Sequence, residues 1–168
     1  MQTESLFSLI DRMSIANLKV FHYTKAGNLE AAAIAQGQVN DLGVAGDVYV
    51  YECVTGKRKP LLRPHLRVHD HRKIEGKWAG KKEEMEEPKS IMECAWMLAS
   101  ANAQYWDNQS TLQTLKSMID KSDGLPDKPR LESDFCARQR RQDIFNQRRN
   151  DLIDLGDQMF ADAVENGR

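Results

Sequence analysis

Polar side chains at or near helical core positions are the residues of this sequence best suited to hold a ligand. Apolar stripes are interrupted by Asn17, Asn102 and Arg149. Asp41 and Asp151 stand close to these stripes. An asparagine buried without hydrogen-bond partners costs on the order of 1–3 kcal/mol, so we expect these five to bond one another across a bundle centre. Two interpretations stay open. The network fixes the register of the helices, or it lines a pocket that binds a small phosphorylated or sugar substrate.

A second candidate site is the cationic segment 57–82, which contains ten lysines and arginines and only two acidic residues. Such a cluster attracts phosphate backbones, which makes the segment a candidate arm for nucleic acid or another polyanion. Its anion-binding candidates are Arg63, Arg67, Arg72 and Lys73. The alternative is a solvated loop that lies against acidic surface of its own chain or of a second copy. Only Trp78 is nearby for base stacking.

Three histidines in the same segment have a spacing that suggests a metal site. His65 and His69 would share one face of a helix, but Pro64 precedes them and the segment does not read as helical. In an extended conformation, His71 joins them on one face, where Arg67 would place a cation among the ligands. The sequence therefore predicts no metal and no cofactor.

Sequence motifs of the common enzyme classes are missing from the chain. A di-iron bundle needs Glu-x-x-His pairs on two helices. Phosphate-binding loops need Gly-x-x-x-x-Gly-Lys or Gly-x-Gly-x-x-Gly, and a nucleophile elbow needs Gly-x-Ser-x-Gly. Glu84 and Glu87 have the Glu-x-x-Glu spacing of the all-helical nucleotide pyrophosphatases, but Pro88 follows and the partner motif is lacking. These observations favour a protein without enzymatic activity.

Helices are the elements that must position these residues. The apolar spacing predicts four of them, over residues 4–24, 29–53, 88–121 and 133–164. Gly27 is expected to stop the first helix and Asn28 to cap the second. The third begins either at Pro88 or at a capping box of Ser90 and Glu93.

An internal repeat relates the second and fourth helices. Residues 40–47 and 150–157 share the pattern N-D-L-x-x-x-G-D. A duplicated hairpin cannot bury its apolar face alone, so two copies must pack together. The prediction is an all-α four-helix bundle of two related hairpins, residues 4–54 and 88–165, joined by the basic loop 55–87. Glycine inside a helix costs about 1 kcal/mol, so the repeated Gly46 and Gly156 are expected at close helix contacts, or else at local bends.

Length and composition place limits on these interpretations. A chain of 168 residues favours one domain, residues 1–168, and a net charge of −1 creates no overall attraction to nucleic acid or membranes. Three cysteines far apart, Cys53, Cys94 and Cys136, fit reduced thiols. The start lacks signal-peptide character, and no run approaches the roughly 18 apolar residues of a membrane span. A cytoplasmic protein without a membrane partner is expected.

The segment Leu9–His22 resembles the opening of a family of uncharacterised bacterial helical proteins, L-x-D-x-L-S-I-x-N-L-K-x-W-H. The segment Asn146–Ile153 is similar to that family's closing helix. Phe21 stands where tryptophan is usual, and the basic loop is not associated with the family. The resemblance implies a helical bundle and no activity.

Taken together, the residues predict a non-enzymatic binding or scaffold bundle, with a homodimer as its expected assembly. Binding of nucleic acid or another polyanion through residues 57–82 is the first alternative. An enzyme that acts at the polar bundle centre is the second.

Overall fold

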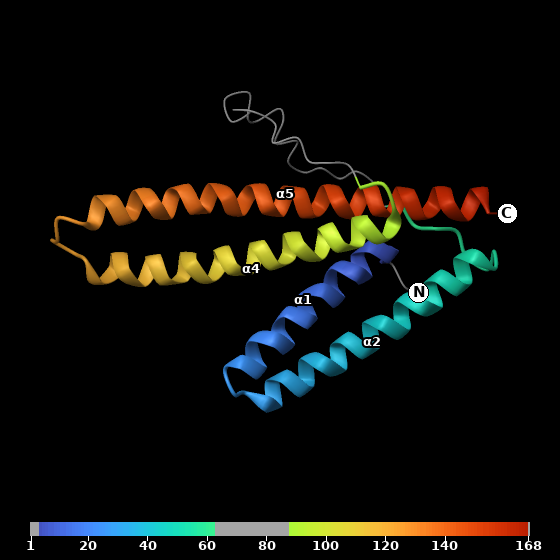
Figure 1. The fold of residues 1–168 in the computed structure, drawn as a ribbon, viewed down its shortest axis with the longest axis horizontal. Coiled ribbons are helices and arrows are strands. Elements are labelled where there is room, and N and C mark those ends of the chain that lie inside the picture. The colour runs from blue at the N-terminus through green and yellow to red at the C-terminus, as the bar shows by residue number, and fades with distance from the viewer. Residues whose placement is uncertain (1–3, 63–87, 168) are drawn as a thin grey trace, which may run out of the picture.

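The computed structural model describes residues 4–62 and 88–167. They form an all-α four-helix bundle of two hairpins, which confirms the predicted fold class (Figure 1). The hairpins consist of α1 (Leu6–Lys25) with α2 (Leu29–Val54), and α4 (Ile91–Lys121) with α5 (Lys128–Asn166). Most of the basic segment, including Arg63, Arg67, Arg72 and Lys73, lies outside the described residues, as do His65, His69 and His71.

The turn between α1 and α2 follows the expected chemistry. Gly27 adopts φ of 74°, a left-handed conformation that costs glycine little. The Asn28 side chain then accepts a hydrogen bond of 3.1 Å from the Ala31 N–H and caps α2.

The start of α4 agrees with one of its two predicted positions, whereas the start of α5 differs from its predicted position. Ser90 caps α4 by accepting the Glu93 N–H at 3.1 Å, while the Glu93 carboxylate accepts the Lys89 N–H at 2.7 Å. The capping box, and not Pro88, therefore begins this helix. α5 begins at Lys128, earlier than predicted, because Pro129 sits in its first turn, where a missing N–H costs nothing.

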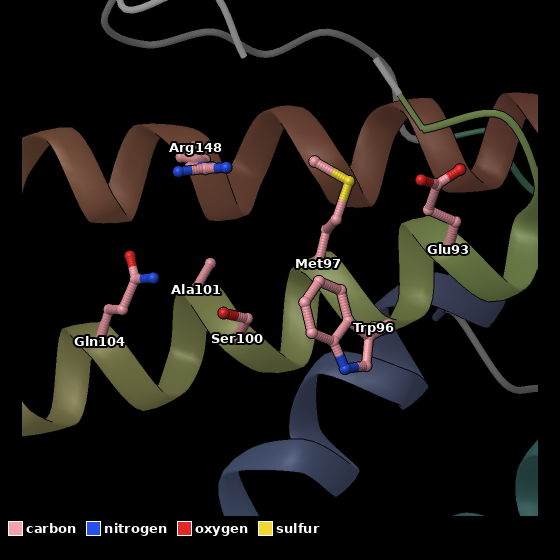
Figure 2. A pocket seen from close by; sticks show the side chains of 7 residues that line it. All are labelled: Glu93, Trp96, Met97, Ser100, Ala101, Gln104 and Arg148. Atoms are coloured by element: carbon pink, nitrogen blue, oxygen red, sulfur yellow. The ribbon is translucent and has the colours of Figure 1, made fainter. Parts of the chain in front are cut away.

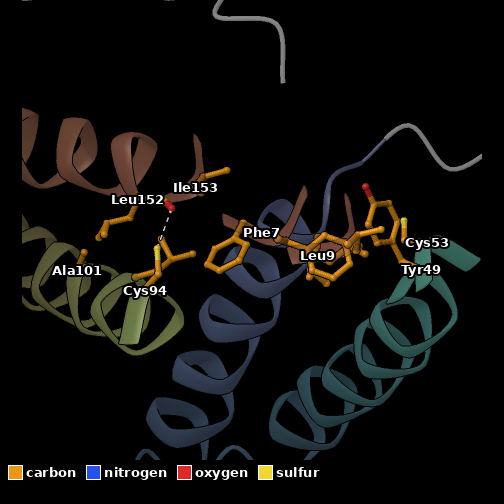
Figure 3. Close-up of a cluster of buried hydrophobic side chains, with 12 residues drawn as sticks. Phe7, Leu9, Tyr49, Cys53, Cys94, Ala101, Leu152 and Ile153 are labelled. Carbon is orange, nitrogen blue, oxygen red and sulfur yellow. Dashed lines mark hydrogen bonds between the residues drawn. The ribbon is translucent and has the colours of Figure 1, made fainter. Parts of the chain in front are cut away.

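One hydrophobic core joins the two hairpins and draws residues from all four helices (Figure 3). Its centre is Phe7 of α1, which is fully buried and reaches toward Cys94 and Leu152 of the second hairpin. Gly156 of α5 lies directly against the Phe7 ring, so that any side chain there would overlap with it. The predicted close contact at Gly156 is correct, and it fixes where α1 crosses α5.

The equivalent glycine in the first half of the repeat has a different environment. A Cβ atom added to Gly46 would meet nothing within 4 Å among the described residues, so the close contact predicted there is wrong. The cause is an asymmetry in the packing. α1 contacts both α4 and α5, whereas α2 lies on the outside of the molecule, with α1 between it and α4 (Figure 1).

The second hairpin extends well beyond α1 as a two-helix arm (Figure 1). Buried amides connect its helices: the Asn108 Nδ2 donates to the Arg138 carbonyl at 3.0 Å and to Gln142 Oε1 at 2.6 Å. Gln142 Nε2 in turn donates to Gln109 Oε1 at 2.9 Å. Paired amides in an otherwise thin interface favour one register of α4 against α5.

The two repeat glycines allow a matched test of this packing. Gly156→Ala should destabilise the protein by about 1–3 kcal/mol, because the added methyl group would overlap the buried Phe7 ring and overpack the core. Gly46→Ala should instead stabilise it by about 0.5–1 kcal/mol through helix propensity. Urea unfolding followed by circular dichroism measures both. Equal effects of the two substitutions would contradict the observed asymmetry.

Candidate functional site

Asp11 of α1 is the centre of the polar network inside the bundle. Its carboxylate is buried and receives Arg149 of α5 in a bidentate arrangement, with Nε to Oδ1 at 2.6 Å and Nη2 to Oδ2 at 2.6 Å. Parallel hydrogen bonds of this kind are among the strongest that side chains form. The ion pair therefore ties α1 directly to α5.

Asn102 brings α4 into the same network. Its buried Nδ2 group donates to Asp11 Oδ1 at 2.9 Å and to Ser14 Oγ at 2.6 Å. Ser14 Oγ donates to the Asp11 carbonyl oxygen at 2.8 Å. Side chains from three helices thus converge on one carboxylate. We call Asp11, Ser14, Asn102 and Arg149 the polar clamp.

The bonding pattern of the polar clamp is typical of a structural network. Asp11 accepts three hydrogen bonds and its charge is balanced by Arg149, so it has neither the free lone pairs nor the exposure that a general base requires. The hydrogen bonds to Asp11, together with its charge, hold the pKa of Arg149 above its ordinary value, against the lowering effect of burial. The guanidinium of Arg149 is therefore held in its ionised form.

The structure brings together only two of the five residues predicted for the bundle centre. Asn102 and Arg149 meet, but Asn17 is exposed on α1 and Asp41 is exposed on α2. Asp151 is half-buried and accepts a hydrogen bond of 2.8 Å from Gln147 of its own helix. These three predictions are therefore wrong for the polar centre.

Sequence reasoning missed Asp11 and Ser14 because it assigned one buried stripe to the first helix. α1 has two buried faces, since α2 packs on one side and the second hairpin on another. Phe7, Asp11 and Ser14 recur at spacings of four and three, and they line the side toward α4 and α5. That second periodicity is visible in the sequence and was the available signal.

Asp157 supplies a further polar link between the hairpins. Its buried carboxylate accepts the Phe7 N–H at 2.9 Å, so a side chain of α5 caps the N-terminus of α1. Unpaired N–H groups and the positive end of the helix dipole both favour a carboxylate there. Asp47, its counterpart in the repeat, is exposed.

Two open grooves flank the helices. One, of about 490 Å³, lies between α1 and α2 and is lined by Arg12, Lys19 and Asp41 among others. The other, of about 340 Å³, is lined by six α4 residues and Arg148 of α5 (Figure 2). The smaller groove contains Ser100 and Glu93, but the Glu93 carboxylate accepts the Lys89 N–H in the cap of α4. Within residues 4–62 and 88–167, no group of three or more histidine, cysteine or acidic side chains could hold a metal ion.

Cys94 also lacks the features of a catalytic thiol. Cys94 is fully buried, and its thiol donates to the Leu152 carbonyl at 3.3 Å. Burial, reinforced by the negative charge of Asp157, raises the pKa of this thiol to about 11. Since the thiolate is the reactive form, Cys94 serves as a packing group.

An uncovered apolar surface lies on α2. We call Ile34, Gly37, Val44, Val48 and Tyr51 the outer stripe: they recur at helical spacing, with the exposed Asp41 between Gly37 and Val44, and the four side chains of the stripe are exposed. The buried residues of α2, such as Ala35 and Tyr49, lie on its opposite side. A helix that is apolar on both sides is usually buried on both. No described helix is long and apolar enough to cross a membrane.

Removal of the Asp11 charge should test the polar clamp. Asp11→Asn leaves Arg149 largely buried without a counter-charge, and breaking such pairs costs about 3–5 kcal/mol. The Arg149 side chain keeps 24% exposure, so we expect a loss at the lower end of this range, about 3 kcal/mol in the free energy of unfolding. Urea unfolding measures it. The double change Asp11→Leu with Arg149→Met should recover most of the loss. A fully stable Asp11→Asn protein would refute the structural role of the clamp.

The raised pKa of Cys94 predicts a stability change at alkaline pH. The thiol ionises near its ordinary pKa of 9.0 in the unfolded chain but only near 11 in the folded one. Its contribution to stability is therefore complete below about pH 9 and is lost as pH rises through 11. The stability difference between the protein and Cys94→Ala, followed by urea unfolding, should shrink over this window. A difference that is independent of pH would contradict the assignment.

Comparisons of the chain with family models, with curated proteins and with solved structures find no match. The resemblance to a bacterial helical family stays a prediction.

Proposed function

We propose that the protein is a non-enzymatic scaffold that binds a protein partner through the α1–α2 hairpin. The observation that carries the proposal is the outer stripe on α2. Val44, Val48 and Tyr51 place apolar side chains on the side of the helix turned away from α1. Burial of one such side chain contributes roughly 1.5–3 kcal/mol. The surface therefore offers a driving force for association that the described chain does not use.

The state of the polar clamp also supports a scaffold. A catalytic or substrate-binding centre keeps some polar groups available to the ligand. Here the Asp11 carboxylate is occupied by Arg149 and Asn102, and the network joins three helices. Such a network stabilises the junction of the hairpins and positions α2 at the edge of the molecule.

The composition of α2 favours a protein as the partner. Its 26 residues include four acids, Glu30, Asp41, Asp47 and Glu52, and no lysine or arginine. An acidic surface repels nucleic acid and anionic lipid headgroups. An apolar stripe between acidic residues instead suits the face of another helix.

Site-specific photo-crosslinking tests this proposal. A benzophenone amino acid replaces Val48 of the outer stripe, which is 47% exposed, or Ile144 of α5, which is 49% exposed and serves as the matched control. We expect position 48 to yield a defined protein adduct in cells, identified by mass spectrometry, and position 144 to yield none. The absence of any protein adduct at position 48, or the same adducts at both positions, would overturn the proposed function.

A further inference from the structure

We infer that the groove between α4 and Arg148 of α5 binds a small ligand that combines a carboxylate with an aromatic ring. The groove has a volume of about 340 Å³, which is within the range of small-molecule sites. It lies on the second hairpin, whereas the outer stripe lies on the first, so the site is independent of the proposed function. The side chains that line it define the chemistry of the ligand.

One face of α4 forms a wall of the groove. Its residues recur at spacings of three and four, as neighbours on a helix surface do: Glu93, Trp96, Met97, Ser100, Ala101 and Gln104. The acid is at one end of this row, the indole and the thioether follow it, and the hydroxyl and the amide lie toward the other end (Figure 2). The two ends of the groove therefore differ, and a ligand with two different ends would bind in one direction.

Arg148 provides the hydrogen-bond donor from which the ligand can be inferred. The residue is half-buried, and its Nε atom is buried without a hydrogen-bond partner among the described residues. Its neighbour Arg149, in contrast, is bound to Asp11. A buried donor that has lost water without gaining a partner is destabilising, and native structures contain few such groups. An acceptor in the groove would supply the missing partner.

The charges in the groove favour a carboxylate over a phosphate as that acceptor. Among the described residues that line the groove, Arg148 is the only cation and Glu93 the only acid. One guanidinium balances one negative charge, and its planar donors match the two oxygens of a carboxylate. A phosphate dianion would leave a second charge unbalanced in a groove that also contains Glu93.

Trp96 supplies the surface for the aromatic ring. It is 71% exposed, and an aromatic ligand that stacks on its indole would cover apolar area. The thioether of Met97, beside it, also makes favourable contacts with rings. Arg148 lies across from Ala101 (Figure 2). Trp96 and Ala101 are five residues apart, about 7.5 Å along the helix axis, so a short chain should join the ring to the carboxylate.

Titration of the purified full chain with phenylpropionate tests the inference. The indole N–H signals of its three tryptophans are followed by NMR, and Trp96→Phe assigns the signal of Trp96. We expect a saturable shift of that signal. Phenylpropionamide has the same shape without the charge, so it should bind roughly tenfold more weakly. No saturable shift of the Trp96 signal, or equal affinities for the acid and the amide, would overturn the inference.

A matched pair of arginine variants tests the role of Arg148. Arg148→Met keeps an unbranched side chain and removes a buried donor that has no described partner, so the fold should be retained, which circular dichroism checks. Its affinity for phenylpropionate should fall roughly tenfold, to that of the amide. Arg141→Met, at an exposed position of α5 outside the groove lining, should keep the preference for the acid. A folded Arg148→Met protein that still prefers the acid would overturn the inference.

The melting temperature gives a second measurement that does not depend on the Trp96 signal. A ligand that binds only the folded state raises the melting temperature. Phenylpropionate should therefore stabilise the parent and Arg141→Met more than it stabilises Trp96→Ala and Arg148→Met. Equal stabilisation of all four proteins would show binding elsewhere and overturn the inference. Inorganic phosphate that binds more tightly than phenylpropionate would overturn the choice of a carboxylate.

Discussion

The insertion of Phe7 against Gly156 is the contact on which the arrangement of the two hairpins depends. An aromatic ring can enter the core at this depth only where the facing helix has no side chain. Polar bonds hold α1 on either side of the ring: Asp157 accepts the Phe7 N–H, and Asp11 binds Arg149 one helical turn further on. Apolar contact supplies the driving force, while the directional bonds select one orientation.

The position of α2 follows from this docking. Because α1 presents one face to the second hairpin and another to α2, the two hairpins do not pack symmetrically. α2 reaches the second hairpin near its C-terminal end, where Tyr49 lies 6.1 Å from Phe160 between ring centroids. Over the rest of its length the outward side of α2 is not covered by the described residues. The same asymmetry that creates the polar clamp therefore exposes the outer stripe.

The two-helix arm of α4 and α5 shows how a thin interface can keep one register between two helices. Two helices alone bury few apolar residues, and α4 and α5 here add Asn108 and Gln142 at buried positions. Their bonds link side chains and backbone across the pair. The stability of the arm depends on the hydrophobic core that joins the two hairpins, whereas the amides favour one register of α4 against α5.

The sequence by itself determined the local structure. Apolar periodicity, the Gly27 turn, the Asn28 cap and the Ser90–Glu93 box located the helices and their pairing, because these signals act between residues close in the chain. It also placed Asn102, Arg149 and Gly156 correctly at tertiary contacts.

Only the tertiary structure decided which polar groups meet. Asn17 and Asn102 stand at equivalent places on their apolar stripes, yet one is exposed and the other buried. Gly46 and Gly156 share a motif, yet only one receives a ring. Helical spacing defines the faces of a helix, but the rotation of that helix toward its neighbours depends on contacts between residues far apart in the chain. For α1 that rotation is set by Phe7 and Asp11, and their partners lie on the other hairpin.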